Sequence, residues 1–199
     1  MRIVSVEPLD KRRSRVLGDG GLAFVLYGGE IRHYQIEEGK ELAEETYQEI
    51  LESVLCKRAR ERLLYLLKLS DKTESQLRKK LDEGLYPREA VEAAIAFGKR
   101  YGYIDDVRYA ENYVALKGGR KSRRQIAYEL RQKGIGEEIV RECLEENPVD
   151  EDSQIKKWLE KRGFDPETAD EKEWGKTVAF LSRKGFSYTA ILDIMHKKY

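Results

Sequence analysis

Apolar residues along most of this chain recur with the spacing of one helix face. From residue 57 onward they return every three or four positions, which predicts amphipathic helices joined by short turns. Capping-box patterns at Thr73–Gln76 and Ser122–Gln125 mark two of the helix starts. The stripe residues that show the spacing most clearly are Ala59, Leu63, Leu66, Ile126, Leu130, Ile191 and Met195.

A helix-ending motif occurs three times in this helical part. It consists of a leucine, a short polar stretch, a glycine and an apolar residue, and its glycines are Gly84, Gly134 and Gly185 (134 − 84 = 50; 185 − 134 = 51). A fixed period of this size is typical of a tandem array. We therefore expect three tandem three-helix repeats, forming an elongated, curved array. Their predicted bounds are 56–104, 105–148 and 149–199.

The first copy of the motif departs from the other two. The segment from Leu81 to Gly84 is one residue shorter than the segment from Leu130 to Gly134, and it is more acidic.

Residues 1–55 follow a different pattern. Ile3–Val6 reads as an extended segment, Asp19–Gly21 is a hairpin-turn signal, and Leu22–Tyr27 reads as a more buried strand. A helix is expected over about 43–55. The sequence thus predicts a small β-rich module of two or three strands that ends in a helix, attached to a chain whose fold class is mainly α.

Charge adds a candidate binding surface. The chain of 199 residues has 38 Lys and Arg against 37 Asp and Glu, yet seven basic residues gather around the helix that starts at Ser122, with Glu129 as the lone acid among them. Three more occupy the equivalent helix of the first repeat. These ten candidate partner- or DNA-binding residues are Lys117, Arg120, Lys121, Arg123, Arg124, Arg131, Lys133, Arg78, Lys79 and Lys80.

Such a basic helix start has three interpretations. It can hold a phosphate through its side chains and its free backbone N–H groups. It can equally meet acidic residues of a protein, where charge mainly sets encounter rate and register. The third interpretation is a solvated face on a charge-rich protein.

Catalytic and metal-binding chemistry finds little support. Cys56 and Cys143 are far apart without CxxC spacing, and His33 and His196 lack metal-ligand neighbours. The glycine loop at Gly118–Ser122 lacks the spacing of a Walker motif. We expect a non-enzymatic protein without metal or cofactor. Because no apolar run reaches membrane-spanning length and the N-terminus lacks a signal peptide, we also expect a cytoplasmic protein without membrane contact.

Three segments of the second repeat resemble the RecX regulatory protein family: Gly102–Ala110, Ser122–Ile126 and Glu129–Ile135. The likeness is densest over 57–146 and weaker in the third repeat. It implies three tandem three-helix repeats and a bacterial modulator of RecA, with a place in homologous recombination, DNA repair and the SOS response. It also implies binding in the groove of the RecA–DNA filament, restraint of the ATPase, strand-exchange and co-protease functions, and weaker binding to single- or double-stranded DNA. We expect a monomer.

Two other functions remain open on the residues alone. The chain could be a plain DNA-binding protein that uses helix-turn-helix-like repeats, or a scaffold for an unrelated protein. Binding to naked DNA that is steep in salt and as tight as binding to the filament would favour the first.

Overall fold

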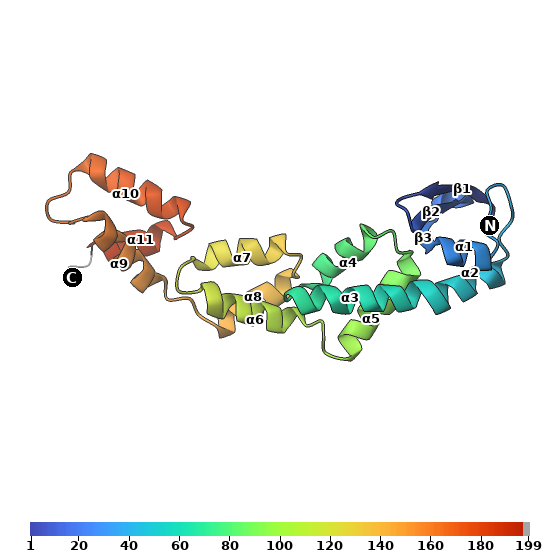
Figure 1. Cartoon of the computed structure of the whole chain (residues 1–199). Helices are drawn as coiled ribbons and strands as arrows, with labels where there is room; N and C mark the ends of the chain where they lie inside the picture. Colours follow the sequence, from blue (N-terminus) through green and yellow to red (C-terminus); the bar gives the residue numbers. More distant parts are fainter. Residues whose placement is uncertain (197–199) are drawn as a thin grey trace. The chain divides into compact units, whose positions relative to one another are not determined.

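Helices make up most of the computed structural model, which describes residues 1–196 (Figure 1). A three-stranded antiparallel sheet lies at the N-terminal end, so the predicted class, mainly α with an N-terminal β-rich module and three-helix repeats, is confirmed. The chain divides into two compact units, Met1–Asp105 and Asp106–Tyr199. The elongated, curved arrangement and the bounds of the four predicted domains stay predictions.

The sheet is a meander of β1 (Ile3–Pro8), β2 (Arg13–Gly18) and β3 (Ala23–Tyr27). Strand β2 lies in the middle, so Val16 faces Val6 on one side and Phe24 on the other. A single 3-10 turn, η1 (Asp19–Gly21), joins β2 to β3 where the sequence predicts a hairpin turn. Val16 and Phe24 are fully buried, which shows the face that the sheet turns toward the helices.

One core joins this sheet to the first helical repeat. It contains Phe24 from the sheet, Ile50 from the adjoining helix, and Leu63, Leu81 and Ile95 from the repeat itself. A continuous helical stretch with a π-helical turn in its middle carries the chain from the module into the repeat. The elements that follow the sheet are α1 (Gly28–His33), α2 (Glu44–Ile50), the π-helical turn η2 (Leu51–Cys56), α3 (Lys57–Leu69), α4 (Glu74–Asp82) and α5 (Arg88–Arg100).

The second unit contains two three-helix repeats, each with a core of its own. The first core centres on Ile126 and Leu130, and the second on Ile155, Leu181 and Ile191. These residues belong to the stripes that the helix spacing predicts, because a helix buries the face on which its apolar residues recur. The helices are α6 (Asp106–Lys117), α7 (Arg123–Gln132), α8 (Glu137–Glu146), α9 (Glu151–Arg162), α10 (Glu171–Arg183) and α11 (Tyr188–His196).

The turn between the second and third helices of each repeat ends in the same backbone geometry. In the second and third repeats, Gly134 and Gly185 adopt φ values of 82° and 88°. The residue after each glycine donates its N–H back into the preceding helix, Ile135 to the Leu130 carbonyl at 3.1 Å and Phe186 to the Leu181 carbonyl at 3.3 Å. This is the Schellman arrangement, whose left-handed position favours glycine.

The first repeat adopts this geometry without a glycine at the left-handed position. Leu85 takes that position with φ 56°, and Tyr86 donates its N–H to the Leu81 carbonyl at 3.4 Å. Four positions therefore separate the helix leucine from the left-handed residue in this repeat, as in the other two. The one-residue difference in the sequence motif therefore does not shorten the turn, because the equivalent of Gly134 is Leu85 and not Gly84. A leucine can occupy this conformation at a cost of roughly 1–2 kcal/mol.

Candidate partner-binding surface

The start of α7 is fixed by hydrogen bonds to the third repeat. Ser122 is fully buried, and its Oγ accepts from the Gln125 N–H at 3.3 Å while donating to the Lys184 carbonyl at 2.9 Å. The Arg123 N–H donates to Glu151 Oε1 at 2.9 Å. Two of the first backbone donors of α7 are thus already bonded. The sequence suggests that free backbone N–H groups at this helix start could hold a phosphate. These two N–H groups cannot contribute to such a site, because Ser122 and the neighbouring repeat already accept their hydrogen bonds.

Three arginine side chains at this helix start remain available to a partner. Arg120, Arg123 and Arg124 are exposed, and none forms a salt bridge with any acid in the described part of the chain. We call these three residues the arginine edge. A cation in the first turn of a helix is unfavourable by about 0.3–1 kcal/mol. The charges of Arg123 and Arg124 therefore do not stabilise α7 through the helix dipole.

A groove of about 410 Å³ runs beside the arginine edge, between α7 and α8. Its floor is apolar, with Ala127, Val140 and Leu144, so a partner would bury both charge and apolar area there. Four arginines against two glutamates give the rim its positive sign. The charged rim residues are Arg123, Arg124, Arg131, Arg141, Glu137 and Glu151.

Other members of the predicted basic cluster are engaged within the second repeat. Lys121 Nζ lies 2.5 Å from Glu129 Oε1, and the Tyr113 hydroxyl donates to the same carboxylate. Burial alone would raise the pKa of Glu129, but the hydrogen bonds from Lys121 and Tyr113 outweigh it and leave that pKa below its usual value. Burial and the bond to Glu129 raise the pKa of Tyr113. The single acid in the cluster thus neutralises one of its lysines.

Three further residues of this cluster are also paired with, or partly covered by, other parts of the protein. Arg131 forms a salt bridge with Glu137, and this hydrogen bond lowers the pKa of the Glu137 carboxyl. Lys133 Nζ lies over the ring of Tyr113, 5.3 Å from its centroid. Lys117 is half-buried in the last turn of α6. The arginine edge is therefore the exposed, unpaired part of the predicted cluster.

The basic residues of α4 are largely neutralised. Arg78 donates to Glu74 at 2.8 Å and to both carboxylate oxygens of Glu92, at 2.7 and 3.0 Å. The hydrogen bond to Glu92 is the main reason that the pKa of Arg78 is raised. Lys80 pairs with Glu83 at 2.6 Å, whereas Lys79 is exposed and forms no ion pair among residues 1–196. Only one of the three predicted residues on α4 thus keeps an unpaired charge.

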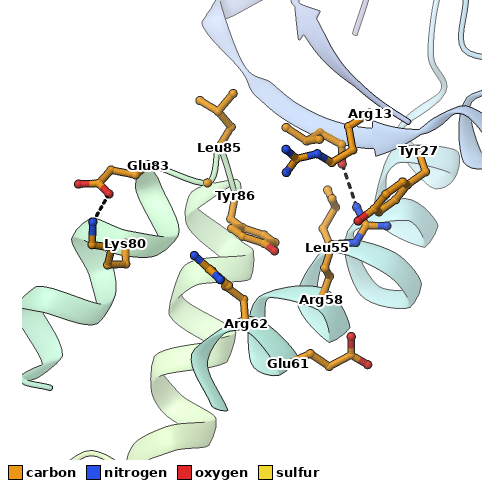
Figure 2. A pocket seen from close by; sticks show the side chains of 12 residues that line it. Arg13, Tyr27, Leu55, Arg58, Glu61, Arg62, Lys80, Glu83, Leu85 and Tyr86 are labelled. Atoms are coloured by element: carbon orange, nitrogen blue, oxygen red, sulfur yellow. Dashed lines mark hydrogen bonds and ion pairs between the residues drawn. The ribbon is translucent and has the colours of Figure 1, made fainter. Parts of the chain in front are cut away.

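A larger hollow lies between the sheet and the first repeat, with a volume of about 570 Å³ (Figure 2). Three of its four cations pair with acids, and the fourth, Arg62, lies over the ring of Tyr65. Arg58 binds the Val25 carbonyl at 3.1 Å and Glu30 at 2.5 Å, and its guanidinium lies 4.5 Å from the centroid of the Tyr27 ring. Arg13 pairs with Asp10 at 2.7 Å. An anion entering this hollow would have to displace those acids, so it suits an anionic partner less well than the arginine edge.

Comparison with known proteins assigns the chain to a family. The family described as RecX, second three-helix domain, matches residues 105–144, and the one described as RecX, third three-helix domain, matches residues 150–195. The regulatory protein RecX of Trichlorobacter lovleyi is 34% identical over 140 residues, which cover 67% of this chain and 91% of that protein. The chain belongs to the RecX family of regulatory proteins.

Whole-length likeness extends beyond those two domains. The regulatory protein RecX of Clostridium acetobutylicum is 27% identical over 201 residues, covering 97% of this chain and 94% of that one. A crystal structure of a regulatory protein RecX aligns over 98% of this chain with a TM-score of 0.67 and 29% identity. The first repeat and the N-terminal segment are therefore shared with other RecX proteins.

The described residues of this RecX chain include no group of three or more His, Cys, Asp or Glu arranged to hold a metal ion. Over the same residues no helix is long and apolar enough to cross a membrane. Cys56 and Cys143 are free thiols, and burial raises the pKa of both. Neither thiol has the lowered pKa of a reactive cysteine.

Some residues around the surface were not predicted from sequence. Glu151 is one of these residues, and its carboxylate accepts the first N–H of α7, from Arg123. Gln154, at the start of α9, donates Nε2 to the carbonyls of Gly118 and Lys121 at 2.7 and 3.3 Å. Both contacts join segments about 30 residues apart, and no local pattern in the sequence marks them.

Proposed function

We propose that this protein binds the filament that the recombinase RecA forms on DNA, and that it restrains the ATPase, strand-exchange and co-protease functions of that filament. Membership of the RecX regulatory family supports a regulatory role. The observation that carries the binding proposal is the arginine edge, because Arg120, Arg123 and Arg124 are exposed and lack an acidic partner in the described chain. Protein–protein interfaces are enriched in arginine, and unpaired cations steer a protein toward an acidic or phosphate-bearing surface.

The proposed mechanism is binding and not catalysis. The α7–α8 groove offers an apolar floor beside the arginines, so it suits a protein surface as well as DNA phosphates. A protein held across neighbouring recombinase subunits would couple them and slow the cycle of ATP hydrolysis and filament growth. We further propose that the protein acts in the cytoplasm as a monomer.

The direct test is the recombinase ATPase on single-stranded DNA, measured while the full chain is titrated in. We expect the rate to fall as the protein approaches a stoichiometric ratio to recombinase. An unchanged rate at that ratio would refute the proposed regulation.

A plain DNA-binding protein is the second candidate, favoured by the two three-helix repeats and the unpaired arginines. The two functions differ in the affinity that they require for naked DNA. If the chain binds naked DNA as tightly as the filament, with a steep loss of affinity as salt increases, the DNA-binding function replaces the first. If it binds neither recombinase nor DNA, a scaffold for another protein is left.

A further inference from the structure

A small hollow of about 290 Å³ lies between the loop that follows α6 and one face of α9. Positive charge surrounds it on both sides, because the loop supplies Arg120 and the helix supplies Lys157 and Lys161. Its lining contains no acid, unlike the α7–α8 groove and the hollow of the first unit. The remaining lining residues are Gly119, Gln154 and Trp158.

Gln154, which lines this hollow, carries a hydrogen-bond acceptor without a partner among the described residues. Its side chain is 4% exposed, and its Nε2 group is bonded to the carbonyls of Gly118 and Lys121. Those bonds orient the amide, so Oε1 cannot exchange places with Nε2 without losing them. Oε1 is buried and has no hydrogen-bond partner. Buried polar atoms are normally paired, and a ligand that brings a donor would satisfy this oxygen.

Trp158 supplies an aromatic surface with a fixed orientation. Its half-buried ring packs edge-on against Phe180, with the centroids 5.5 Å apart. The ammonium of Lys161 lies 5.3 Å from the ring centroid, and that of Lys184 lies 4.8 Å from it. Flexible lysine side chains can move from the ring when another flat group stacks there, and their charge then remains beside that group.

The cations that line this hollow are not held in salt bridges by the described part of the chain. Arg120, Lys157 and Lys161 are exposed, and none forms a salt bridge within residues 1–196. The site therefore combines three free positive charges, one aromatic ring and one buried acceptor. Proteins that bind single-stranded nucleic acids use this combination, with bases stacked on aromatic side chains and phosphates held by cations.

We propose that this hollow binds one unstacked nucleotide of a single-stranded nucleic acid. The base stacks on Trp158 and donates an N–H to Gln154 Oε1, while the flanking phosphates lie against Arg120, Lys157 and Lys161. An acidic peptide fits less well, because a carboxylate brings no donor for Gln154 Oε1. A duplex fits less well too, because its bases are stacked on one another and expose no face to the ring.

This inference deepens the proposed function by naming a nucleic-acid contact, but its test contains no recombinase. The affinity of the full chain is measured by fluorescence anisotropy of a labelled oligothymidine of about 15 nucleotides, a length that covers a typical single-strand site. An abasic strand of the same length keeps the phosphates and removes the bases. We expect the abasic strand and a matched duplex each to bind at least about 10-fold more weakly. Equal affinity for the abasic strand would overturn the stacking proposal.

Substitutions localise the contact. Trp158→Leu should weaken binding of oligothymidine by about 5- to 100-fold, the range for loss of one stacked base. Lys157→Glu should weaken it as well and make the slope of log affinity against log salt shallower by about 0.7. Lys156→Glu is the matched control, since Lys156 is the exposed neighbour of Lys157 but does not line the hollow.

The Lys157→Glu and Lys156→Glu pair keeps the test decisive even if Trp158→Leu disturbs the third repeat, which circular dichroism would reveal. Equal effects of these two charge reversals would overturn the site. Strand binding as described, together with an unaffected recombinase ATPase, would refute the proposed regulation but leave this site standing. Inhibition of the ATPase without binding to free strands would overturn this site but leave the proposed regulation standing. A parallel series with oligouridine shows whether the site distinguishes DNA from RNA.

Discussion

Helices α4 and α7 occupy equivalent places in the first and second repeats, yet their positive charges differ in availability. Both begin at a buried hydroxyl cap, Thr73 for α4 and Ser122 for α7. The first helical residue is Glu74 in α4, which binds Arg78 and Lys99, whereas it is the unpaired Arg123 in α7. Two helices that look similarly basic in sequence therefore present different surfaces. Charge in a sequence indicates a binding surface only where folding leaves that charge unpaired.

The largest expected effect comes from removing the arginine edge. We predict that Arg120→Ala, Arg123→Ala and Arg124→Ala together weaken binding to the recombinase filament at least about 10-fold, because three unpaired cations lose their contacts. The variant should fold normally, since none of the three side chains forms a salt bridge in the described structure. Binding is measured by anisotropy with a labelled protein.

The matched control removes the same charge from α4. Arg78→Ala, Lys79→Ala and Lys80→Ala together should leave filament affinity within about 2-fold and cost at most about 1 kcal/mol of stability, because the lost contacts are partly exposed ion pairs. If both triple variants lose affinity equally, net charge and not the arginine edge determines binding.

The next effect concerns the junction that positions α7. A Cβ atom at Gly185 would lie 2.5 Å from Ser122 Oγ, and the residue has a φ of 88°. We predict that Gly185→Ala lowers the free energy of unfolding by about 2 kcal/mol, through overlap and backbone strain together. Urea denaturation measures the change.

Gly163→Ala separates these two causes. Gly163 also has a left-handed φ, of 65°, but a Cβ there meets nothing within 4 Å. The Gly163→Ala substitution should lower the free energy of unfolding by about 1 kcal/mol, from backbone strain alone. Equal losses in the two variants would show that the contact between Ser122 and Gly185 contributes nothing to the junction.

A smaller effect follows from the acid that neutralises Lys121. The folded pKa of Glu129 lies below the usual value of 4.5, so its carboxylate contributes stability above that value and loses the contribution as pH falls through the folded pKa. We predict that Glu129→Gln lowers the free energy of unfolding by about 1 kcal/mol at pH 7. The difference from the unmodified protein should shrink as pH falls from 5 toward 3. A difference that stays constant over this range would contradict the assignment.

The smallest effect belongs to the turn after α4. Leu85 has φ 56° at the position that is glycine in the other repeats. Leu85→Gly should raise the free energy of unfolding by about 0.5 kcal/mol, because relief of strain exceeds the lost packing and the added freedom of the unfolded chain. Thermal denaturation of both proteins measures it. A loss of more than about 1 kcal/mol would show that the leucine packing matters more than the strain.

Local sequence signals predict much of this fold, and their limits are physical. The stripe through Ile126 and Leu130 and the cap at Ser122 are set by residues three or four positions apart, so the sequence shows them directly. Arg78 pairs with Glu74 on its own helix but also with Glu92 on another helix, and the Arg123 N–H pairs with Glu151 in another repeat. Which cations stay unpaired depends on such distant contacts.

The left-handed residue in the first repeat illustrates a second limit. A glycine nearby in sequence suggests the position, but the backbone places Leu85 there and Gly84 one residue earlier. The hydrogen bond from Tyr86 to Leu81 fixes the turn, and strain at one residue is small beside the packing of the whole repeat. Sequence spacing alone therefore misplaces the turn by one position.

Hydrogen exchange of the full chain, alone and bound to recombinase filaments on single-stranded DNA, tests the central claim most directly. We predict that the amides from Arg120 to Gln125 become protected on binding, whereas those from Glu74 to Lys80 on α4 exchange as they do in the free protein. Protection of the α4 segment without protection around the arginine edge would contradict it.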